Sequence, residues 1–214
     1  MDERTTGIIV RTRPLTETSL IVHWLTPDFG RLSTVAKGAR RPKSPFLGKL
    51  DLFYLAELSF HQSRSSDLHT LREVSVRDYH HGLRGELGYL QQASYFAQIL
   101  EQTTEPDTPL PTLYQLFRQL LAALPQSAPQ ALTVYAFEMK LLIELGLTPD
   151  LNESPLTPGA CQVLESVANA EWPVISRIRI SRAQSGELDQ FLRAFLIYHF
   201  GKITSARSLA VSAM

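Results

Sequence analysis

Residues 7–13 read GIIVRTR and residues 18–25 read TSLIVHWL. Both segments are rich in β-branched side chains, which favour strands. The first ends at Pro14, and the second ends at the turn sequence TPDFG of residues 26–30. Three further strand-like segments follow, at residues 31–38, 50–60 and 68–76. Five short strands with no helical pattern between them predict a small β-barrel at the start of the chain.

The periodicity changes to helical after residue 83, where apolar residues recur at helix-like spacing until Pro106. Further helices are predicted over residues 110–124, 131–145, 160–170 and 187–200. The strand count is that of an OB-fold, although SH3-like barrels have a similar count. We therefore predict an α+β protein with a five-stranded OB-fold barrel over residues 1–80 and an all-α helical domain over residues 81–214, which includes a proline-rich loop at residues 147–159.

The composition is that of a globular protein, with 44% hydrophobic and 20% charged residues. Neither a signal peptide nor an apolar run of about 18 residues is found, so we expect a cytoplasmic protein that does not enter the membrane. The single cysteine, Cys161, cannot form an internal disulfide or a four-sulfur zinc site, and we expect it to be a buried structural thiol. We expect no metal and no cofactor.

Positive charge is concentrated at the two ends of the sequence although the net charge is zero. Residues 1–80 contain 12 Lys and Arg against 9 Asp and Glu, residues 81–170 contain 3 against 9, and residues 171–214 contain 6 against 3. Residues 31–49 carry six cations and no acidic residue. This pattern indicates a polyanionic partner for the first part of the chain.

Strand periodicity places several of these cations on one side of the barrel. Arg11 and Arg13 should share a face, with Ile8 and Val10 opposite, and Arg31 should share a face with Lys37. The loop at residues 37–45 can present four cations to a phosphate backbone. They are Lys37, Arg40, Arg41 and Lys43.

Nucleic-acid binding and a merely solvated loop are equally compatible with the composition of this run. Trp24, Phe29 and Phe46 could stack on bases, although each is better explained as a core residue. The sequence has no phosphate-binding glycine-rich loop, no Gly-x-Ser-x-Gly motif and no clustered carboxylates, so we do not expect an enzyme. The alternative to a DNA-binding protein is an OB-fold adaptor that binds a protein or RNA.

Several segments resemble the signature of RecO, the bacterial recombination mediator family. They are RPLTETSLIV at residues 13–22, TPDFGR at 26–31, VAKGARR at 35–41, FLGKL at 46–50 and LHTLRE at 68–73. The similarity is weaker at FEMKLLIELG, residues 137–146, and at KITSARSL, residues 202–209. It covers most of the chain and is most specific before residue 75.

The resemblance implies an OB-fold followed by helices, in a nucleoid-associated protein that binds single- and double-stranded DNA and anneals complementary strands. It also implies three protein partners: RecR, the acidic C-terminal tail of the single-stranded-DNA-binding protein, and, functionally, RecA. The DNA contacts that it carries over are Arg13, Arg31, Lys37, Arg40 and Arg41, to which charge placement adds Arg11 and Lys43.

Two further expectations follow from the resemblance. Many relatives carry a four-cysteine zinc module where this chain has the loop at residues 147–159, and the cysteines are absent here. A pocket for the acidic tail needs apolar walls and a cation at its rim. Arg118 and Lys140 are the candidates for that cation, although each could equally be an ordinary surface residue.

Overall fold

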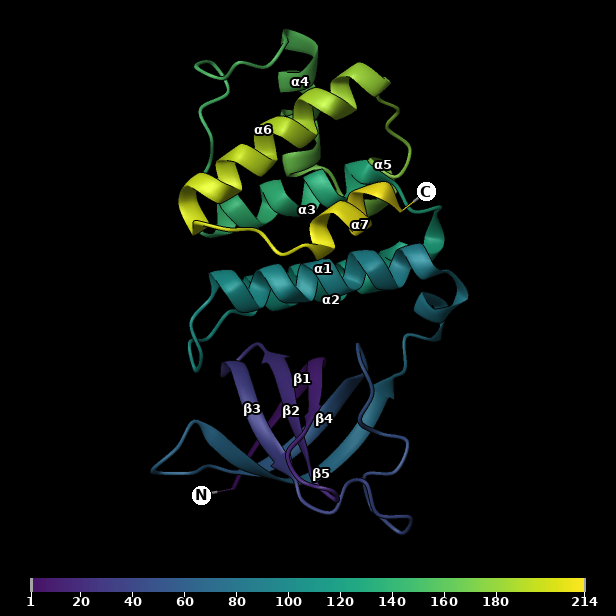
Figure 1. Ribbon diagram of the computed structural model, residues 1–214, viewed down its shortest axis with the longest axis vertical. Coiled ribbons are helices and arrows are strands. Elements are labelled where there is room, and N and C mark those ends of the chain that lie inside the picture. Colours follow the sequence, from purple (N-terminus) through teal and green to yellow (C-terminus); the bar gives the residue numbers. More distant parts are fainter. Residues whose placement is uncertain (1, 214) are drawn as a thin grey trace. The chain divides into compact units, whose positions relative to one another are not determined.

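The computed structural model describes residues 2–213, which form a five-stranded barrel followed by helices (Figure 1). These residues divide into two compact units. The first unit combines residues 2–81 with residues 103–118, and the second combines residues 82–102 with residues 119–213. The first unit thus takes in a helical segment that lies well beyond the barrel strands in the sequence.

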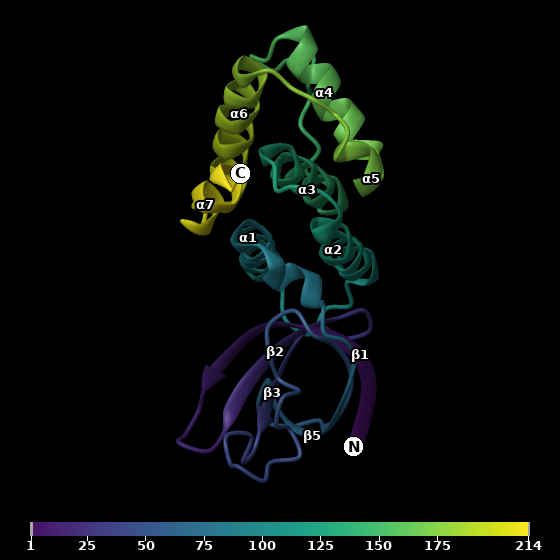
Figure 2. The same ribbon diagram turned by 90° about the vertical axis from the view of Figure 1, so that its right-hand side faces the viewer.

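The five strands close into a barrel in the order β1-β2-β3-β5-β4, with β4 paired to β1 (Figure 2). All pairs are antiparallel except β3 with β5. The predicted fold class, an OB-fold barrel followed by helices, is confirmed. The strands are β1 (Asp2–Pro14), β2 (Leu20–Thr26), β3 (Gly30–Ala36), β4 (Leu55–His61) and β5 (Leu68–Asp78).

The barrel interior is filled by buried side chains from all five strands, led by the fully buried Trp24. The indole Nε1 of Trp24 donates a hydrogen bond to Thr34 Oγ1 at 2.9 Å, so the one polar atom of this ring has a partner inside the core. Phe46 is also buried in this core. Phe29 is only partly buried and meets Phe60 edge-on at a centroid distance of 5.4 Å. The core interpretation is therefore confirmed for Trp24 and Phe46, and Phe29 packs at the margin.

A β-bulge in β1 overturns one predicted side-chain placement. Ile8 pairs with Leu25, but the register shifts between Ile9 and Arg11, so that Arg11 pairs with His23. Because Leu25 and His23 lie two residues apart, Ile8 and Arg11 share a face. The expectation that Ile8 lies opposite the arginines is wrong, because strict alternation cannot anticipate an extra residue in the strand.

Residues 103–118 pack against the start of β3. The backbone N–H of Asp107 donates to the Arg31 carbonyl at 3.1 Å, and Phe117 meets Phe53 at 6.4 Å between ring centroids. Gly30 adopts a φ of +60°, and a Cβ there would lie 1.8 Å from the Thr108 carbonyl oxygen. Only glycine fits this turn, since both the backbone angle and the close approach exclude a side chain.

The second unit is organised around α3 (Ala131–Glu144), which is buried along most of its length. Phe137 of α3 packs against Phe96 of α1 (Leu87–Thr103), with ring centroids 4.3 Å apart. The remaining helices are η1 (His81–Gly85), α2 (Pro111–Ala123), η2 (Leu124–Gln126), α4 (Pro158–Asn169), α5 (Trp172–Ile175), α6 (Arg182–Phe200) and α7 (Ala206–Ser212). The sequence did not predict α5 and α7, because both are too short to show a period.

The start of α6 is set by a capping box that the periodicity missed. Ser181 accepts from the Gln184 backbone, and the Gln184 side chain accepts from the Ser181 N–H. The helix therefore begins at Arg182 rather than at the predicted residue 187.

No helix within residues 2–213 is long and apolar enough to cross a membrane.

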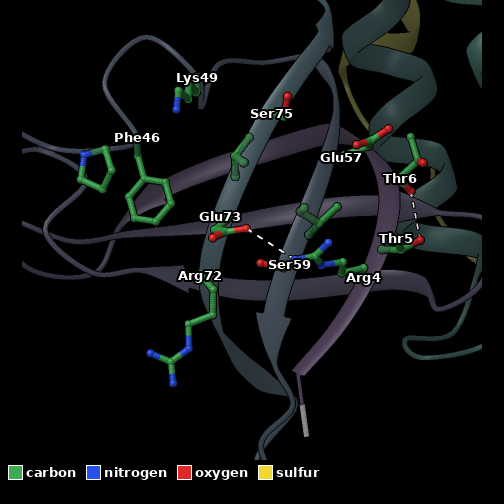
Figure 3. Close-up of a pocket in the computed structure, with 13 residues that line it drawn as sticks. Arg4, Thr5, Thr6, Phe46, Lys49, Glu57, Ser59, Arg72, Glu73 and Ser75 are labelled. Carbon is green, nitrogen blue, oxygen red and sulfur yellow. Dashed lines mark hydrogen bonds and ion pairs between the residues drawn. The ribbon is translucent and has the colours of Figure 1, made fainter.

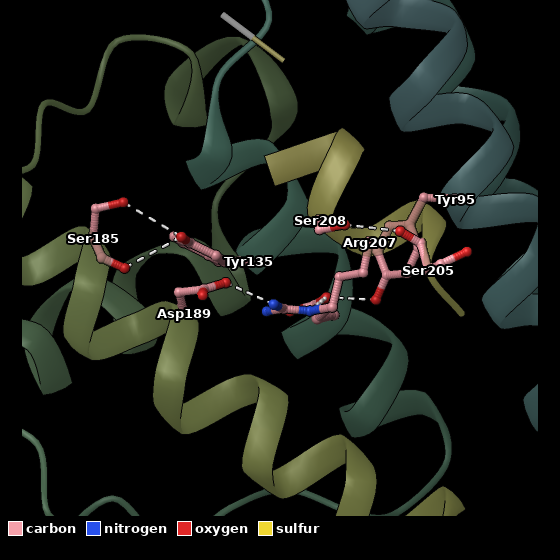
Figure 4. A network of polar contacts seen from close by, with 8 residues as sticks. Tyr95, Tyr135, Ser185, Asp189, Ser205, Arg207 and Ser208 are labelled. Atoms are coloured by element: carbon pink, nitrogen blue, oxygen red, sulfur yellow. Dashed lines mark hydrogen bonds and ion pairs between the residues drawn. The ribbon is translucent and has the colours of Figure 1, made fainter. Parts of the chain in front are cut away.

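A buried ion pair joins α7 to α3 (Figure 4). Arg207 Nε donates to Glu138 Oε1 at 2.7 Å, and Arg207 Nη1 donates to Asp189 Oδ1 on α6 at 2.6 Å. The hydroxyl of Tyr95 donates to the same Glu138 oxygen at 2.5 Å. Burial and the adjacent Glu138 carboxylate raise the pKa of Tyr95 well above its ordinary value. The Glu138 carboxylate of α3 therefore binds α1 and α7 directly, and Arg207 extends the network to α6.

Cys161 departs from its predicted burial. The side chain is only partly buried, and its thiol donates a weak hydrogen bond to the Leu151 carbonyl at 3.6 Å. The thiol lies at the start of α4, beneath the loop that precedes this helix, and not inside the core.

Candidate nucleic-acid interface

The loop at residues 37–45 presents four exposed cations, and we call it the cationic loop. It consists of successive tight turns, in which Arg41 N–H donates to the Gly38 carbonyl and Ser44 N–H donates to the Arg41 carbonyl, each at 3.0 Å. Gly38 has a φ of +69°, a conformation that glycine adopts without strain. Its exposed cations are Lys37, Arg40, Arg41 and Lys43.

Two buried side chains and a neighbouring turn fix this loop on the barrel. Ala39 and, just beyond the loop, Phe46 are buried in the barrel core. Arg40 N–H donates to the Thr18 carbonyl at 3.0 Å, and its guanidinium Nη1 donates to the Thr16 carbonyl at 3.3 Å. These contacts hold the loop backbone in one conformation, and the cations project from it.

Strand register brings cations of β1 and the cationic loop to one end of the barrel. Pro14 pairs with Leu20, and Leu20 pairs with Ala36, so the end of β1 and the end of β3 are level. Arg13 directly precedes this row and Lys37 directly follows it. Residues that are 24 positions apart in the sequence are thus placed on the same rim.

Arg11 and Arg13 are exposed and lie on the outer face of β1 beside His23. The half-buried His23 ring is bonded through Nδ1 to Ser33 Oγ at 3.0 Å. Burial, followed by the charges of Arg13, Arg11 and Arg31, lowers the pKa of His23 to about 4. The imidazole is consequently neutral near pH 7, and the positive charges beside it add to the effect of burial. The sequence does not single out His23, because strand pairing is what places Arg11 beside it.

Arg31 differs from the other predicted contacts. Its guanidinium Nη2 donates to the Thr104 carbonyl, and its Nε is buried. The side chain holds residues 103–118 against β3, which is a structural role. The structure therefore brings six of the predicted cations to an exposed surface and leaves Arg31 partly buried.

The two candidates for the peptide tail lie in different units. Arg118 is exposed at the end of the first unit's helical segment. Lys140 is half-buried in the second unit, where its Nζ donates to the Ala168 carbonyl at 2.9 Å and lies 5.8 Å from the centre of the Trp172 ring. Burial lowers the pKa of Lys140. Lys140 thus ties α3 to the end of α4 and lies beside the first residue of α5.

The described residues provide no obvious metal site. No group of three or more His, Cys, Asp or Glu side chains within residues 2–213 is arranged to hold a metal ion. The chemistry that the exposed surface supports is ionic attraction to a polyanion.

Together these features define an OB-fold protein with a helical extension and a cationic loop at one end of its barrel. Comparison with protein families then gives the particular family. Residues 1–80 match the model of the recombination protein O N-terminal region, and residues 84–157 match that of the recombination protein O C-terminal region. The chain belongs to the RecO family.

Curated relatives support the same assignment. The chain is 34% identical to DNA repair protein RecO of Rhodopirellula baltica over 143 residues, which are 67% of this chain and 53% of the relative. It is 30% identical to DNA repair protein RecO of Listeria monocytogenes over 151 residues, 71% of this chain and 58% of the relative. It is also 30% identical to DNA repair protein RecO of Bacillus subtilis over 146 residues, which are 68% of this chain and 56% of the relative. The matched stretch spans little more than half the length of these relatives.

Proposed function

We propose that this protein is a non-catalytic DNA repair and recombination mediator that binds DNA through one end of its barrel. The observation that carries the proposal is the cationic loop, whose four exposed cations lie within a run, residues 31–49, that contains no acidic residue. Membership in a family whose relatives are named DNA repair proteins supports the same function.

The type of contact determines the type of binding. Lysine and arginine side chains on an exposed loop reach phosphates, which are present at every position of every sequence. We therefore propose binding to single-stranded and double-stranded DNA with little sequence preference, and the annealing of complementary strands. Arg11, Arg13 and the four loop cations make the contacts. Arg31 contributes less, because its side chain is partly buried where its guanidinium donates to the Thr104 carbonyl.

We propose the partners that the family resemblance implies. RecR and the acidic tail of the single-stranded-DNA-binding protein would bind this chain, which would then help to load RecA in the bacterial cytoplasm, at the nucleoid. Arg118 remains the more accessible candidate for the tail, since Lys140 would first have to release the Ala168 carbonyl. We place the DNA-binding domain at residues 1–80 and the helical domain at residues 81–214.

The test is a titration of a fluorescent single-stranded oligonucleotide at several salt concentrations. The wild-type protein is compared with a Lys37→Ala, Arg40→Ala, Arg41→Ala triple variant. We expect the slope of log affinity against log salt to become shallower by about 2, since each phosphate neutralised on a single strand contributes about 0.7. Addition of the complementary strand should show accelerated annealing with the wild type and slower annealing with the variant.

A matched control removes the same charge elsewhere. Arg177→Ala, Arg179→Ala, Arg182→Ala takes three exposed arginines from the second unit. If the control and the loop variant lose affinity equally, the site is wrong. If the wild type binds no DNA at low salt, the alternative of an OB-fold adaptor for a protein or RNA replaces the proposal.

A further inference from the structure

The second half of α6 carries an exposed aromatic surface. Residues 194–200 read AFLIYHF, and of these only Leu196 is buried. The side chain of Tyr198 is 83% exposed. The His199 ring contacts its neighbours, with centroids 4.5 Å from Phe195 and 5.0 Å from Tyr198. Aromatic side chains grouped on a surface are typical of protein interfaces.

These rings continue a line of side chains that begins where α6 meets α4. Glu187 accepts hydrogen bonds from the N–H and the hydroxyl of Thr157, at the start of α4, at 3.1 and 2.8 Å. Helical spacing places Phe191 and Phe195 on the same side of α6 as Glu187. The two helices diverge from this end (Figure 2), so α4 leaves the second half of that side uncovered. We call the following residues the aromatic stripe: Phe191, Phe195, Tyr198 and His199.

The end of α6 is exposed because α3 ends before it. Tyr135 of α3 donates to the Ser185 carbonyl of α6 at 3.2 Å, and Glu138 shares one guanidinium with Asp189. The two helices therefore run in the same direction. Beyond this last contact α3 continues for six residues, to position 144, whereas α6 continues for eleven, to position 200. The last turn of α6 thus extends past the helix that it packs on.

Acidic residues border one side of the aromatic stripe. The chain runs along this side from the end of α3 to Thr157, which is bonded to Glu187. Residues 144–153 contain no lysine or arginine, and their three acidic side chains are exposed. These side chains are Glu144, Asp150 and Glu153.

Cations border the other side of the aromatic stripe. Arg193 and Ile197 lie on the side of α6 that faces α7, where both line a cavity with residues of α7. Lys202 directly follows Gly201, which ends α6. Arg193 and Lys202 are exposed, and residues 190–214 contain no acidic residue. The aromatic stripe therefore separates an acidic side from a cationic side.

The carboxylates of a groove on the barrel are arranged differently. This groove has a volume of about 560 Å³ and is lined by β1, β4, β5 and residues 45–49 (Figure 3). Glu73 lies 4.0 Å from Arg4, and Glu57 accepts from Arg77 at 2.6 Å. These carboxylates are paired within the chain. The three carboxylates beside the aromatic stripe form no ion pair within residues 2–213, so they are available to a second molecule.

We propose that the aromatic stripe is the interface between two copies of this chain. A two-fold axis that passes between the acidic and the cationic side exchanges them, so each acidic side faces the cations of the other copy. The rings of the two stripes then bury one another, and the largely exposed Tyr198 gains most from this burial. A face one helix wide is a small interface, so we expect a reversible dimer that forms as the concentration rises.

A partner with one sign of charge fits this surface less well than a second copy does. A polyanion such as DNA would be repelled by the carboxylates of residues 144–153. A strongly basic segment would be repelled by Arg193 and Lys202. A second copy meets each side with the opposite charge, and this complementarity selects it.

The dimer has a consequence for DNA. It carries two barrels and therefore two cationic loops. The consequence rests on the proposed function, whereas the self-association does not: if each loop holds a single strand, two complementary strands are brought onto one particle at a high local concentration. Annealing should then be faster for the dimer than for the monomer.

The first experiment is sedimentation velocity of the full chain, without DNA, over a range of concentrations. We expect a monomer–dimer equilibrium for the wild type, and we expect Tyr198→Ser to weaken it about tenfold or more. The matched control is Leu87→Ser, which removes a 68% exposed apolar side chain at the start of α1 and should leave the equilibrium unchanged. Both side chains are exposed, so circular dichroism should show that both variants fold. A wild type that stays monomeric, or equal effects of the two changes, would overturn the proposal.

The second experiment tests the two-fold arrangement by reversing charges. In the Arg193→Glu, Lys202→Glu variant both sides of the aromatic stripe are acidic, and in the Glu144→Lys, Glu153→Lys variant both are mainly basic. We expect each variant alone to be monomeric at concentrations at which the wild type is dimeric. An equal mixture should form dimers again, because every acidic side now faces a basic one. A mixture that stays monomeric would overturn the two-fold pairing of the charges.

Oligonucleotide binding separates this inference from the proposed function. Tyr198→Ser should bind a single-stranded oligonucleotide as tightly per chain as the wild type, and should anneal complementary strands more slowly. If the wild type dimerises but binds no DNA, the proposed function fails and the dimer stands. If the monomeric variant anneals as fast as the wild type, the link between the dimer and annealing is overturned.

Discussion

The barrel and the helical unit use arginine in opposite ways. On the cationic loop, Arg40 and Arg41 are exposed in a segment without an acidic residue. In the helical unit, Arg207 is 4% exposed and donates to both Glu138 and Asp189. The comparison teaches that an exposed charge without a carboxylate partner is available to a ligand, whereas a charge saturated by carboxylates holds the fold together.

Arg31 stands between these two cases. It belongs to the same cationic run as Arg40, and the guanidinium groups of both donate to a backbone carbonyl, but Arg31 is partly buried whereas Arg40 is exposed. A carbonyl is a weaker partner than a carboxylate, because it carries only a partial charge. We therefore expect the cost of removing an arginine to increase from the loop, through Arg31, to Arg207.

The largest effect is expected for Arg207→Met. The change leaves Glu138 buried without its cation, and breaking a buried ion pair by removing one partner costs about 3–5 kcal/mol. Denaturant unfolding of the helical unit, followed by circular dichroism, measures this loss. Arg193→Met on exposed α6 is the control, with an expected change below about 0.5 kcal/mol. Equal stability of the two variants would mean that the buried network does not hold α7 in place.

The next effect concerns the pKa of His23, which burial and then the neighbouring barrel arginines lower. The pKa of His23 is about 4 in the folded protein, below the ordinary value of 6.5. The unfolded chain therefore binds a proton between these two pH values while the folded chain does not. His23 therefore does not lower the free energy of unfolding above pH 6.5. As the pH decreases from 6.5 toward 4, the protonation of His23 in the unfolded chain lowers the free energy of unfolding by at most about 1.4 kcal/mol per pH unit.

His23→Gln isolates this contribution, because glutamine does not titrate. We expect its unfolding free energy to change less between pH 6.5 and pH 4.5 than that of the wild type. Identical pH profiles would show that the pKa of His23 is not lower in the folded protein than in the unfolded chain.

Arg31→Ala is expected to cost about 1–2 kcal/mol, because one hydrogen bond from a charged donor is lost. Thermal unfolding measures the cost, and limited proteolysis should cut residues 103–118 faster. The salt dependence of oligonucleotide binding should change less than it does for Arg40→Ala. A larger change for Arg31→Ala would place this arginine among the principal phosphate contacts.

The parts of the molecule that were predictable are local in sequence. Each strand carries its own β-branched residues, and the cations of the loop follow one another, so both could be read without knowing the fold. The bulge after Ile9 and the packing of residues 103–118 on the barrel depend on pairings between distant segments. The positive charge of residues 171–214 includes Arg207, and the sequence does not show that this arginine is paired, because its partner Glu138 lies 69 residues away.

The smallest effect on stability is expected for the loop itself. The Lys37→Ala, Arg40→Ala, Arg41→Ala variant should unfold within about 0.5 kcal/mol of the wild type, since these exposed charges have no carboxylate partner to lose. The backbone bond from Arg40 to Thr18 does not depend on the side chain and should persist. Thermal unfolding at low and high salt checks this expectation. Removing three cations reduces the repulsion between the positive charges of the loop, so the variant should be slightly more stable than the wild type at low salt, where this repulsion is least screened. A loss above 2 kcal/mol would show that the loop cations support the barrel, and the contrast with Arg207 would disappear.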